Sequence, residues 1–371
     1  MRLQENVSVV QLFALVFNFE IGTSIVVGLG TEAKQDAWIA VLIGTVLGVG
    51  VTFFYYKLLT FCPGKNLFEI MEFSFGRIIA VGLSLLYIGF FFYISARISR
   101  DFGELIATAI LPNTPIEVIS MLLMLLIAYV LYLGLEPLAR TAEIFSPYII
   151  IFIGLLNLFL WVSGKLKMFR IEPVLANGWK PIAEVVFPDI MAFPFGLMVT
   201  FTTIMCYTTK FRYAGKVAML GVGAAGLLLS YVIAMQFMAL GVDSLARSNF
   251  PLLNTAREVS VAQFIERIDA IVVFIMMLGI FVQCSVYMFA GFKGIEYVFN
   301  VPYRSIVFPI SMLVSLFSVM IANNFAEHIE EGLKYNLLFF ITPMAYAIPP
   351  FLFAATYIKY RKQRKKKEGL V

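Results

Sequence analysis

Charge is scarce in this sequence of 371 residues: Asp, Glu, Lys and Arg together make up 14%, where a soluble globular chain has about 25%. Hydrophobic residues reach 61%, and the mean hydropathy is +0.89. A soluble globular protein is therefore excluded, and the composition is that of an integral membrane protein.

Histidine and cysteine are also scarce. The single histidine, His328, has three glutamates around it, and we expect it in a solvated acidic loop. The three cysteines show no C-x-x-C spacing: Cys62, Cys206 and Cys284. This set predicts neither a disulfide framework nor a metal cluster, so no metal or other cofactor is expected.

Enzyme motifs are missing as well. The sequence has no P-loop, no glycine-rich dinucleotide turn after a strand, no HExxH and no GxSxG. The first apolar run is longer than the core of a cleavable signal and lacks an A-x-A exit, so we expect it to be retained. The expected chemistry is recognition of a ligand, and the chain is predicted not to be an enzyme.

Long uncharged hydrophobic runs are what the sequence has in abundance. Runs of about 18 or more such residues predict membrane-spanning helices. Ten are found when Glu20 is allowed inside the first, which predicts an all-α integral membrane protein. They are Val7 to Leu29, Ala37 to Tyr56, Ile78 to Ala96, Val118 to Leu135, Ile144 to Gly164, Ile190 to Thr209, Val217 to Val242, Ala270 to Phe292, Ser305 to Ala326, and Tyr335 to Ile358.

Basic residues predict the orientation, because cytoplasmic segments retain Lys and Arg. The tail KYRKQRKKK carries seven of them, which places residues 359–371 in the cytoplasm. With ten spans the N-terminus is then cytoplasmic too. Without the tail the two sides are nearly balanced, so charge alone leaves an odd number of spans open. We expect the tail to lie near anionic lipid headgroups and to have no nucleic-acid role.

The first span contains the unusual stretch FEIGTSIVVG, residues 19 to 28. An ionised side chain such as Glu20 costs about 2.5–3.5 kcal/mol at the bilayer centre and is a functional candidate by default. Gly22 is a poor helix former, and the hydroxyls of Thr23 and Ser24 compete for backbone groups. The helix can open here, and its free N–H and C=O groups would suit a zwitterion. Alternatively, Gly22 is a close-packing contact between helices.

A second interruption occurs in the sixth span, in MAFPFGLM, residues 191 to 198, where Pro194 removes a backbone donor and Gly196 loosens the turn. Ten helices divide into five plus five, so the two interruptions fall in the first helix of each half. That correspondence indicates an inverted-repeat transporter fold with its site near the midplane. We expect one domain over residues 1–358, with halves of about 7–164 and 187–358.

Four stretches resemble the spore germination receptor B-subunit family, a branch of the amino acid-polyamine-organocation (APC) superfamily with a LeuT-like fold. They are EPVLANGWKPI (172–182), FPFG (193–196), FIERIDA (264–270) and NTPIEVI (113–119). The resemblance implies a germinant-sensing subunit in the inner spore membrane. Its implied partners are a receptor A subunit and a lipoprotein C subunit.

The resemblance also implies a ligand site between broken helices 1 and 6. Its residues would be Gly22 and Thr23 in the first span, Ile94 in the third, Phe193, Phe195 and Gly196 in the sixth, and Gln283 and Tyr287 in the eighth. Gln283 and Tyr287 are four apart and so share a helix face. Each side chain has an alternative: the apolar ones as packing residues, Gln283 as an interhelical hydrogen bonder, and Tyr287 as a core tyrosine.

Two residues of this chain depart from the pattern of the family, and two clusters of charged residues lie at the ends of predicted spans. Many family members carry Glu after FPFG, whereas this chain has Leu197 there and an acid at Glu20, which we expect to meet a ligand's ammonium group. One cluster, at the outer end of the eighth span, consists of Glu266, Arg267 and Asp269; we expect it to form ion pairs that stabilise an outer gate, with direct ligand entry as the alternative. The other, at the end of the third span, consists of Arg100, Asp101 and Glu104, and we expect similar ion pairs there.

The fold serves both sensors and carriers. A coupling-ion site is not evident, because the fifth span has no Lys and the eighth offers Ser285 as its only hydroxyl apart from Tyr287. This favours a sensor of a small nutrient, for which we expect an amino acid, over a secondary amino-acid transporter. An intramembrane enzyme is the most remote alternative.

Overall fold

The computed structural model describes residues 5–25, 27–259 and 269–367. In these residues nine helices are long and apolar enough to cross a membrane, and a shorter apolar helix covers Val9–Ile25. The predicted ten spans are therefore present. Their main elements are α1 (Val9–Ile21), α2 (Ala37–Thr60), α4 (Arg77–Ala109), α5 (Ile116–Leu133), α6 (Leu135–Val162), α7 (Lys180–Glu184) with η4 (Val185–Ile190) and η5 (Phe195–Thr203), α8 (Phe211–Leu240), α11 (Asp269–Phe299), α12 (Tyr303–Met320), and η7 (Glu331–Ile341) with η8 (Pro343–Ala347) and α14 (Ile348–Lys367).

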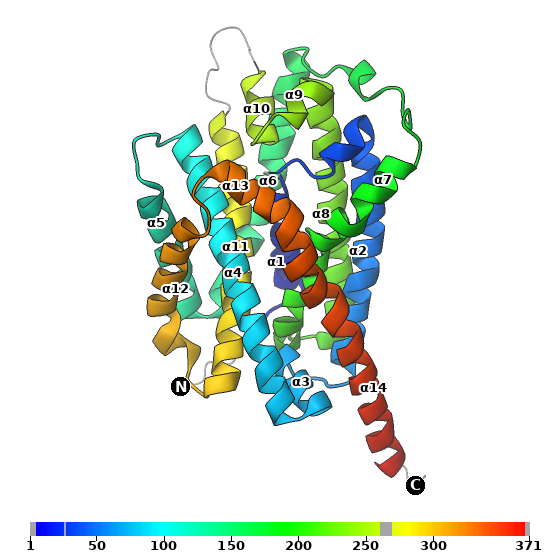
Figure 1. The fold of residues 1–371 in the computed structure, drawn as a ribbon, viewed down its shortest axis with the longest axis vertical. Helices are drawn as coiled ribbons and strands as arrows, with labels where there is room; N and C mark the ends of the chain where they lie inside the picture. Colours follow the sequence, from blue (N-terminus) through cyan, green and yellow to red (C-terminus); the bar gives the residue numbers. More distant parts are fainter. Residues whose placement is uncertain (1–4, 26, 260–268, 368–371) are drawn as a thin grey trace.

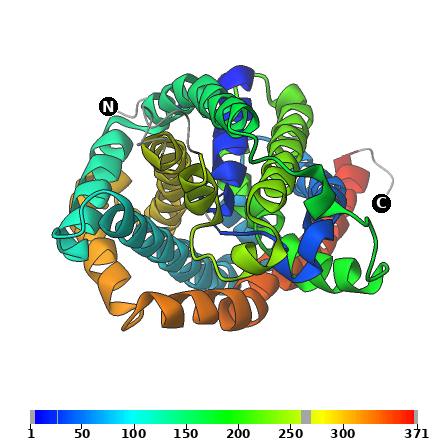
Figure 2. The same ribbon diagram turned by 90° about the horizontal axis from the view of Figure 1, so that it is seen from above.

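The long helices run along the longest axis of the molecule, and the first described residues, before α1, lie toward the same end as the C-terminal end of α14 (Figure 1). Seen along that axis, α11 lies inside the bundle (Figure 2), and its apolar core is 78% buried, the largest share of any span. Among the nine long helices, the sixth span follows with 67%. Nine of the 13 residues of α1 are buried as well. The first, sixth and eighth spans thus form much of the interior.

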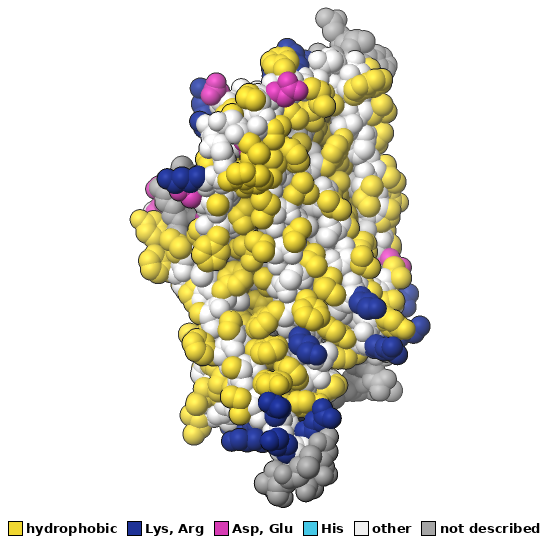
Figure 3. Space-filling view, turned by 90° about the vertical axis from the view of Figure 1, so that its right-hand side faces the viewer, with side chains coloured by type: hydrophobic (Ala, Val, Ile, Leu, Met, Phe, Trp, Pro, Cys, Tyr) yellow, Lys and Arg dark blue, Asp and Glu magenta, His cyan; other side chains and the backbone are white. Residues whose placement is uncertain are grey.

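Hydrophobic side chains cover the middle of the face that Figure 3 shows, and Lys and Arg gather on it toward the end where α14 terminates. Ile78 and Met320 are 90% and 81% exposed. Large apolar side chains exposed over a whole surface require an apolar solvent, as a bilayer provides.

Several helices are longer than the uncharged runs predicted. α4 continues beyond Ala96 to Ala109, and α6 begins at Leu135 rather than Ile144. The added turns carry charges that pair along the same helix, Arg100 with Glu104 at 2.8 Å and Arg140 with Glu136 at 2.7 Å. Such i,i+4 pairs stabilise a helix where hydropathy alone would end it.

The connections contain short helices that the hydropathy pattern did not predict: α3 (Leu67–Phe75), η3 (Met168–Ile171), α9 (Val242–Ala246), α10 (Pro251–Arg257) and α13 (Phe325–Glu330). A separate turn, η6 (Met205–Tyr207), lies at the end of the predicted sixth span. α3 starts with a capping box between Asn66 and Glu69. α13 is the one that matters for the site, because it leads directly into η7.

Candidate functional site

The first span is broken at the predicted position. α1 ends at Ile21, Gly22 caps it, and a single 3-10 turn, η1 (Thr23–Ile25), follows. The next helical turn is η2 (Thr31–Asp36), which leads into α2. The part after the break is therefore one short turn rather than a second half-helix.

Gln283 fills this break. Its Oε1 accepts hydrogen bonds from the Thr23 backbone N–H at 2.8 Å and from the Thr23 hydroxyl at 3.0 Å. A Cβ on Gly22 would lie 2.3 Å from the same oxygen, and a Cβ on Gly279 would lie 3.1 Å from the Gly22 Cα. Gly22 thus lies at the break of the first span and also in close contact with α11. The two alternatives for this residue, a helix opening and a close-packing contact, therefore both hold.

The sixth span is interrupted at Phe193 and Pro194, between η4 and η5. The Tyr346 hydroxyl, from η8, donates a hydrogen bond to the Met191 carbonyl beside the break. A Cβ on Gly196 would lie 2.8 Å from that carbonyl oxygen and 2.9 Å from the Tyr346 ring. Glycine is therefore required here for close approach, and Tyr346 satisfies a carbonyl that the interruption exposes.

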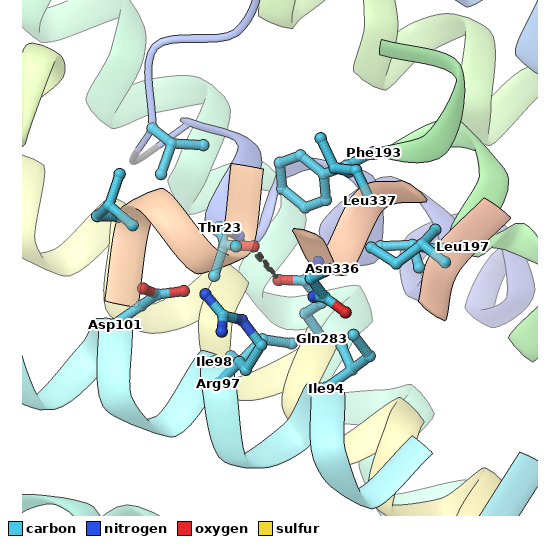
Figure 4. A pocket seen from close by; sticks show the side chains of 14 residues that line it. Thr23, Ile94, Arg97, Ile98, Asp101, Phe193, Leu197, Gln283, Asn336 and Leu337 are labelled. Carbon is cyan, nitrogen blue, oxygen red and sulfur yellow. Dashed lines mark hydrogen bonds between the residues drawn. The ribbon is translucent and has the colours of Figure 1, made fainter. Parts of the chain in front are cut away.

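A pocket of about 80 Å³ lies where the two breaks meet. This volume is several times the roughly 10–15 Å³ that one water needs. Four predicted site residues line it: Thr23, Ile94, Phe193 and Gln283. Figure 4 shows them converging from the first break, α4, the sixth span and α11. The other lining residues are Val27, Arg97, Ile98, Asp101, Leu197, Ile329, Gly332, Asn336, Leu337 and Ile341.

The other predicted site residues are buried but are not among the residues that line this pocket. Phe195 packs into a groove on α2, where a Cβ on Gly48 would come within 2.6 Å of its side chain. The Tyr287 ring contacts Phe19 and Phe91, with centroids 5.0 and 6.4 Å away. Gly22 and Gly196 contribute the backbone described above.

Glu20 is fully buried, and neither carboxylate oxygen has a hydrogen-bond partner among the described residues. The Gln283 Nε2 is likewise buried without a partner there. A buried polar group without a hydrogen-bond partner costs free energy. Beside the first break these groups are the Glu20 carboxylate and the Gln283 amide nitrogen.

Arg97 and Asp101 line the pocket but were not predicted to do so. They lie three and seven positions after Ile94, so they share its helix face. This spacing was the available signal, but the predicted span ended at Ala96. Asn336 was missed for another reason: it lies in the π-helical η7, whose spacing departs from the 3.6-residue period.

The expectation for His328 was wrong. Its side chain is only 1% exposed, and its Nε2 lies 2.8 Å from Asp101 Oδ1. The ring also stacks on Phe325. Three nearby glutamates suggested a solvated loop, but α13 turns this face inward against α4. Asp101 therefore pairs with His328, while Arg100 pairs with Glu104 as expected.

The predicted outer-gate cluster can be placed only in part. Glu266 and Arg267 lie outside the described residues. Asp269 begins α11, and its carboxylate accepts a hydrogen bond from the Ala270 N–H at 3.0 Å.

A second cavity of about 990 Å³ lies at the end of the molecule where the first described residues are. Lys293 is one of the residues that line it, with Glu296 at 2.8 Å, Glu5 at 3.6 Å, and the rings of Tyr207 and Tyr303 each 5.2 Å away. The N-terminal segment is also joined to the end of the sixth span by an isolated parallel bridge between Val7 and Thr208. This cavity is strongly polar, in contrast to the small pocket.

Comparison with known proteins identifies the family. Residues 6–326 match the sequence profile described as "Spore germination protein". The chain is 34% identical to spore germination protein KB of Bacillus subtilis (strain 168), over 98% of this chain and 97% of that protein. It is 23% identical to spore germination protein A2 of the same organism, over 95% of each chain.

Solved structures show the fold. MHP1, a nucleobase-cation-symport-1 family transporter in a closed conformation with bromovinylhydantoin bound, matches with a TM-score of 0.69 and 12% identity, over 96% of this chain and 91% of that one. MhsT in complex with L-phenylalanine matches with a TM-score of 0.68 and 11% identity, over 93% of this chain and 87% of that one. The predicted LeuT-like fold is confirmed.

The expectations of a multi-pass membrane protein and of a protein that is not an enzyme are confirmed by the family and the fold together. With 321 consecutive residues of the chain inside the family match and a near full-length relative, the chain belongs to the spore germination protein family.

Proposed function

We propose that this chain is the germinant-sensing membrane subunit of a spore germinant receptor and that it binds a small nutrient, an amino acid, between broken spans 1 and 6. The observation that carries the proposal is the pocket at the junction of both breaks, in a member of this family. Its volume of about 80 Å³ is well below the roughly 300–1,000 Å³ of drug-sized pockets, which favours a small ligand.

Binding acts by population shift. The ligand favours one packing of the first and sixth spans against the surrounding helices, and this change passes to a receptor A subunit and a lipoprotein C subunit. A shift from 1:99 to 99:1 requires the two packings to differ in ligand affinity by about 5.5 kcal/mol. We place the protein in the inner spore membrane with both termini cytoplasmic, because the basic tail favours that orientation.

The test uses spores that lack this gene. Their loss of optical density is compared with that of parental spores against single amino acids, sugars and nucleosides. We expect the response to one class of germinant to disappear and to return with the intact gene. Gly22→Trp should fail to restore it, because even a Cβ at this position meets Gln283 at 2.3 Å.

Gly89→Trp is the matched control. Gly89 is exposed on α4, and a Cβ there meets nothing within 4 Å. This variant should restore the response in full. Unchanged responses in the null spores to every germinant would contradict the proposal.

The alternative function is a secondary amino-acid transporter, which the fold favours because both solved relatives named above bind small molecules, and one of them is described as a transporter. Purified chain in proteoliposomes separates the two functions. Accumulation of labelled amino acid by this chain alone would support the carrier.

A further inference from the structure

One wall of the small pocket belongs to a single segment, α13 with η7, residues 325–341, which we call the lid. It contributes the lining residues Ile329, Gly332, Asn336, Leu337 and Ile341. The lid follows α12 and crosses the upper part of α4 (Figure 1). Among the described residues that line the pocket, five of fourteen therefore come from the lid.

The lid is held to α4 by the two charged residues of the pocket. His328 Nε2 lies 2.8 Å from Asp101 Oδ1, and Arg97 donates a hydrogen bond to the His328 carbonyl. Arg97 Nη1 also lies 3.7 Å from the Glu331 carboxylate. A Cβ on Gly332 would come within 2.3 Å of Arg97 Nη2, so the lid backbone lies directly on the guanidinium group.

Arg97 and Asp101 are the only charged residues among those that line the pocket. Both project from α4 toward the lid (Figure 4). The lid offers a nitrogen donor to the carboxylate, and a carbonyl and a carboxylate to the guanidinium. A zwitterionic amino acid offers the same two groups, an ammonium and a carboxylate, and charge-assisted hydrogen bonds of this kind are the strong ones.

We propose that Arg97 binds the ligand's carboxylate and Asp101 its ammonium group, and that the lid occupies both positions until the ligand displaces it. This inference rests on the proposed function and names the ligand class and the regulation of its site. His328 and Glu331 act as an internal competitor. The apparent affinity is then the intrinsic affinity reduced by the fraction of molecules in which the lid is released.

The nearby Arg100 does not take part in this competition. Its Nη2 pairs with Glu104 on its own helix at 2.8 Å, and its Nη1 donates to the Val319 carbonyl at 3.2 Å. Arg97 and Asp101 are thus the charges on this face of α4 that depend on the lid.

The two members of the His328–Asp101 pair should act in opposite directions. His328→Leu removes the competing group that occupies Asp101 and keeps an apolar group against Phe325, so the half-maximal germinant concentration should fall by about 3- to 10-fold. Asp101→Asn removes the ligand's own partner, so the same concentration should rise by about 10-fold or more. The measurement is optical-density loss of spores across a concentration series of the amino acid whose response requires this gene.

Glu136→Gln is the control, because the Glu136–Arg140 pair lies on an exposed face of α6, and it should leave the concentration unchanged. Shifts of His328→Leu and Asp101→Asn in the same direction would mean that the pair is only structural and would overturn the inference. Immunoblots of spore membranes verify that each variant is present.

Ligand analogues provide a second measurement that needs no variant. On unmodified spores, the N-acetyl and the carboxamide derivatives of that amino acid should each be at least about 10-fold less potent, because each lacks one of the two charges. Equal potency of either derivative would overturn the inference. If the null spores lose only a sugar or nucleoside response, the sensor function stands and this inference fails; if they lose none, the proposed function itself fails.

Discussion

At the scale of one residue, Glu20 is the unusual group of the first span, because it is a carboxylate inside a membrane-spanning segment. It is fully buried, and neither of its carboxylate oxygens has a hydrogen-bond partner in the described chain. A buried carboxylate without a partner carries an effective cost of several kcal/mol. Packing of the ligand-free protein alone does not account for such a group.

Glu20→Gln should therefore separate stability from response. The neutral isostere avoids the cost of a buried charge, so the melting temperature of the ligand-free protein in detergent should stay the same or rise. The response to a cationic or zwitterionic germinant should weaken, because a negative charge beside the first break is lost, while the direct contact with the ammonium group is the one assigned to Asp101. Equal half-maximal concentrations for the variant and the parent would refute a role for this carboxylate in ligand binding.

Some residues of the candidate site could be predicted from the sequence, and others could not. Glu20, Gly22 and Thr23 stood out because charge and poor helix formers are rare inside a span, and the structure does place the break there. His328 was misjudged because composition does not reveal which face of a short helix turns inward. Its pairing with Asp101 joins residues 227 positions apart, a contact that no local pattern encodes.

At the scale of elements, the sixth span depends on a neighbour. The interruption at Pro194 leaves backbone groups unpaired, and Tyr346 from η8 satisfies the Met191 carbonyl. Unpaired backbone inside a membrane protein is tolerated where a neighbouring element provides the missing partner. η8 therefore helps to hold the broken span in its observed conformation.

Tyr346→Phe should destabilise the protein by about 0.5–2 kcal/mol, because a buried carbonyl loses its partner while the ring is kept. Thermal unfolding in detergent measures the change. Tyr335→Phe is the control in the preceding η7, since Tyr335 is exposed, and it should have no effect. Equal melting temperatures for Tyr346→Phe and the parent would show that the hydroxyl is not needed.

Element boundaries were the least predictable part of the fold. The hydropathy pattern located all ten spans, since each needs about 20 apolar residues. It placed the end of α4 too early and the start of α6 too late, because charged residues interrupt the apolar runs there. Ion pairs along the helix carry both helices further. The pocket face of α4 lies across that predicted end, which is why Arg97 and Asp101 were missed.

At the scale of the whole molecule, the two ends differ. The lid closes the small pocket toward one end, and Lys293 ties the N-terminal segment over a cavity of about 990 Å³ at the other. Tyr303 adds a hydrogen bond to Glu5 at 2.8 Å. Lys293, on α11, interacts with the N-terminal segment through Glu5, with the end of the sixth span through Tyr207, and with α12 through Tyr303.

Lys293→Met should loosen the N-terminal segment. The measurement is the rate of maleimide labelling at Val7→Cys in a background without native cysteines; Val7 is fully buried, so labelling should be slow in the parent. We expect the rate to rise several-fold with Lys293→Met. Lys216→Met, at an exposed position on α8, should leave it unchanged. No difference between the two variants would argue against a tie at Lys293.

The lid has a kinetic consequence. With the proposed orientation, a germinant arrives from the face that the lid closes, so the lid must move before the ligand reaches Arg97 and Asp101. The onset of the response would then stop accelerating at high concentration, with a ceiling set by the rate of lid movement rather than by diffusion. A spore would thereby gain a delay that no excess of nutrient shortens.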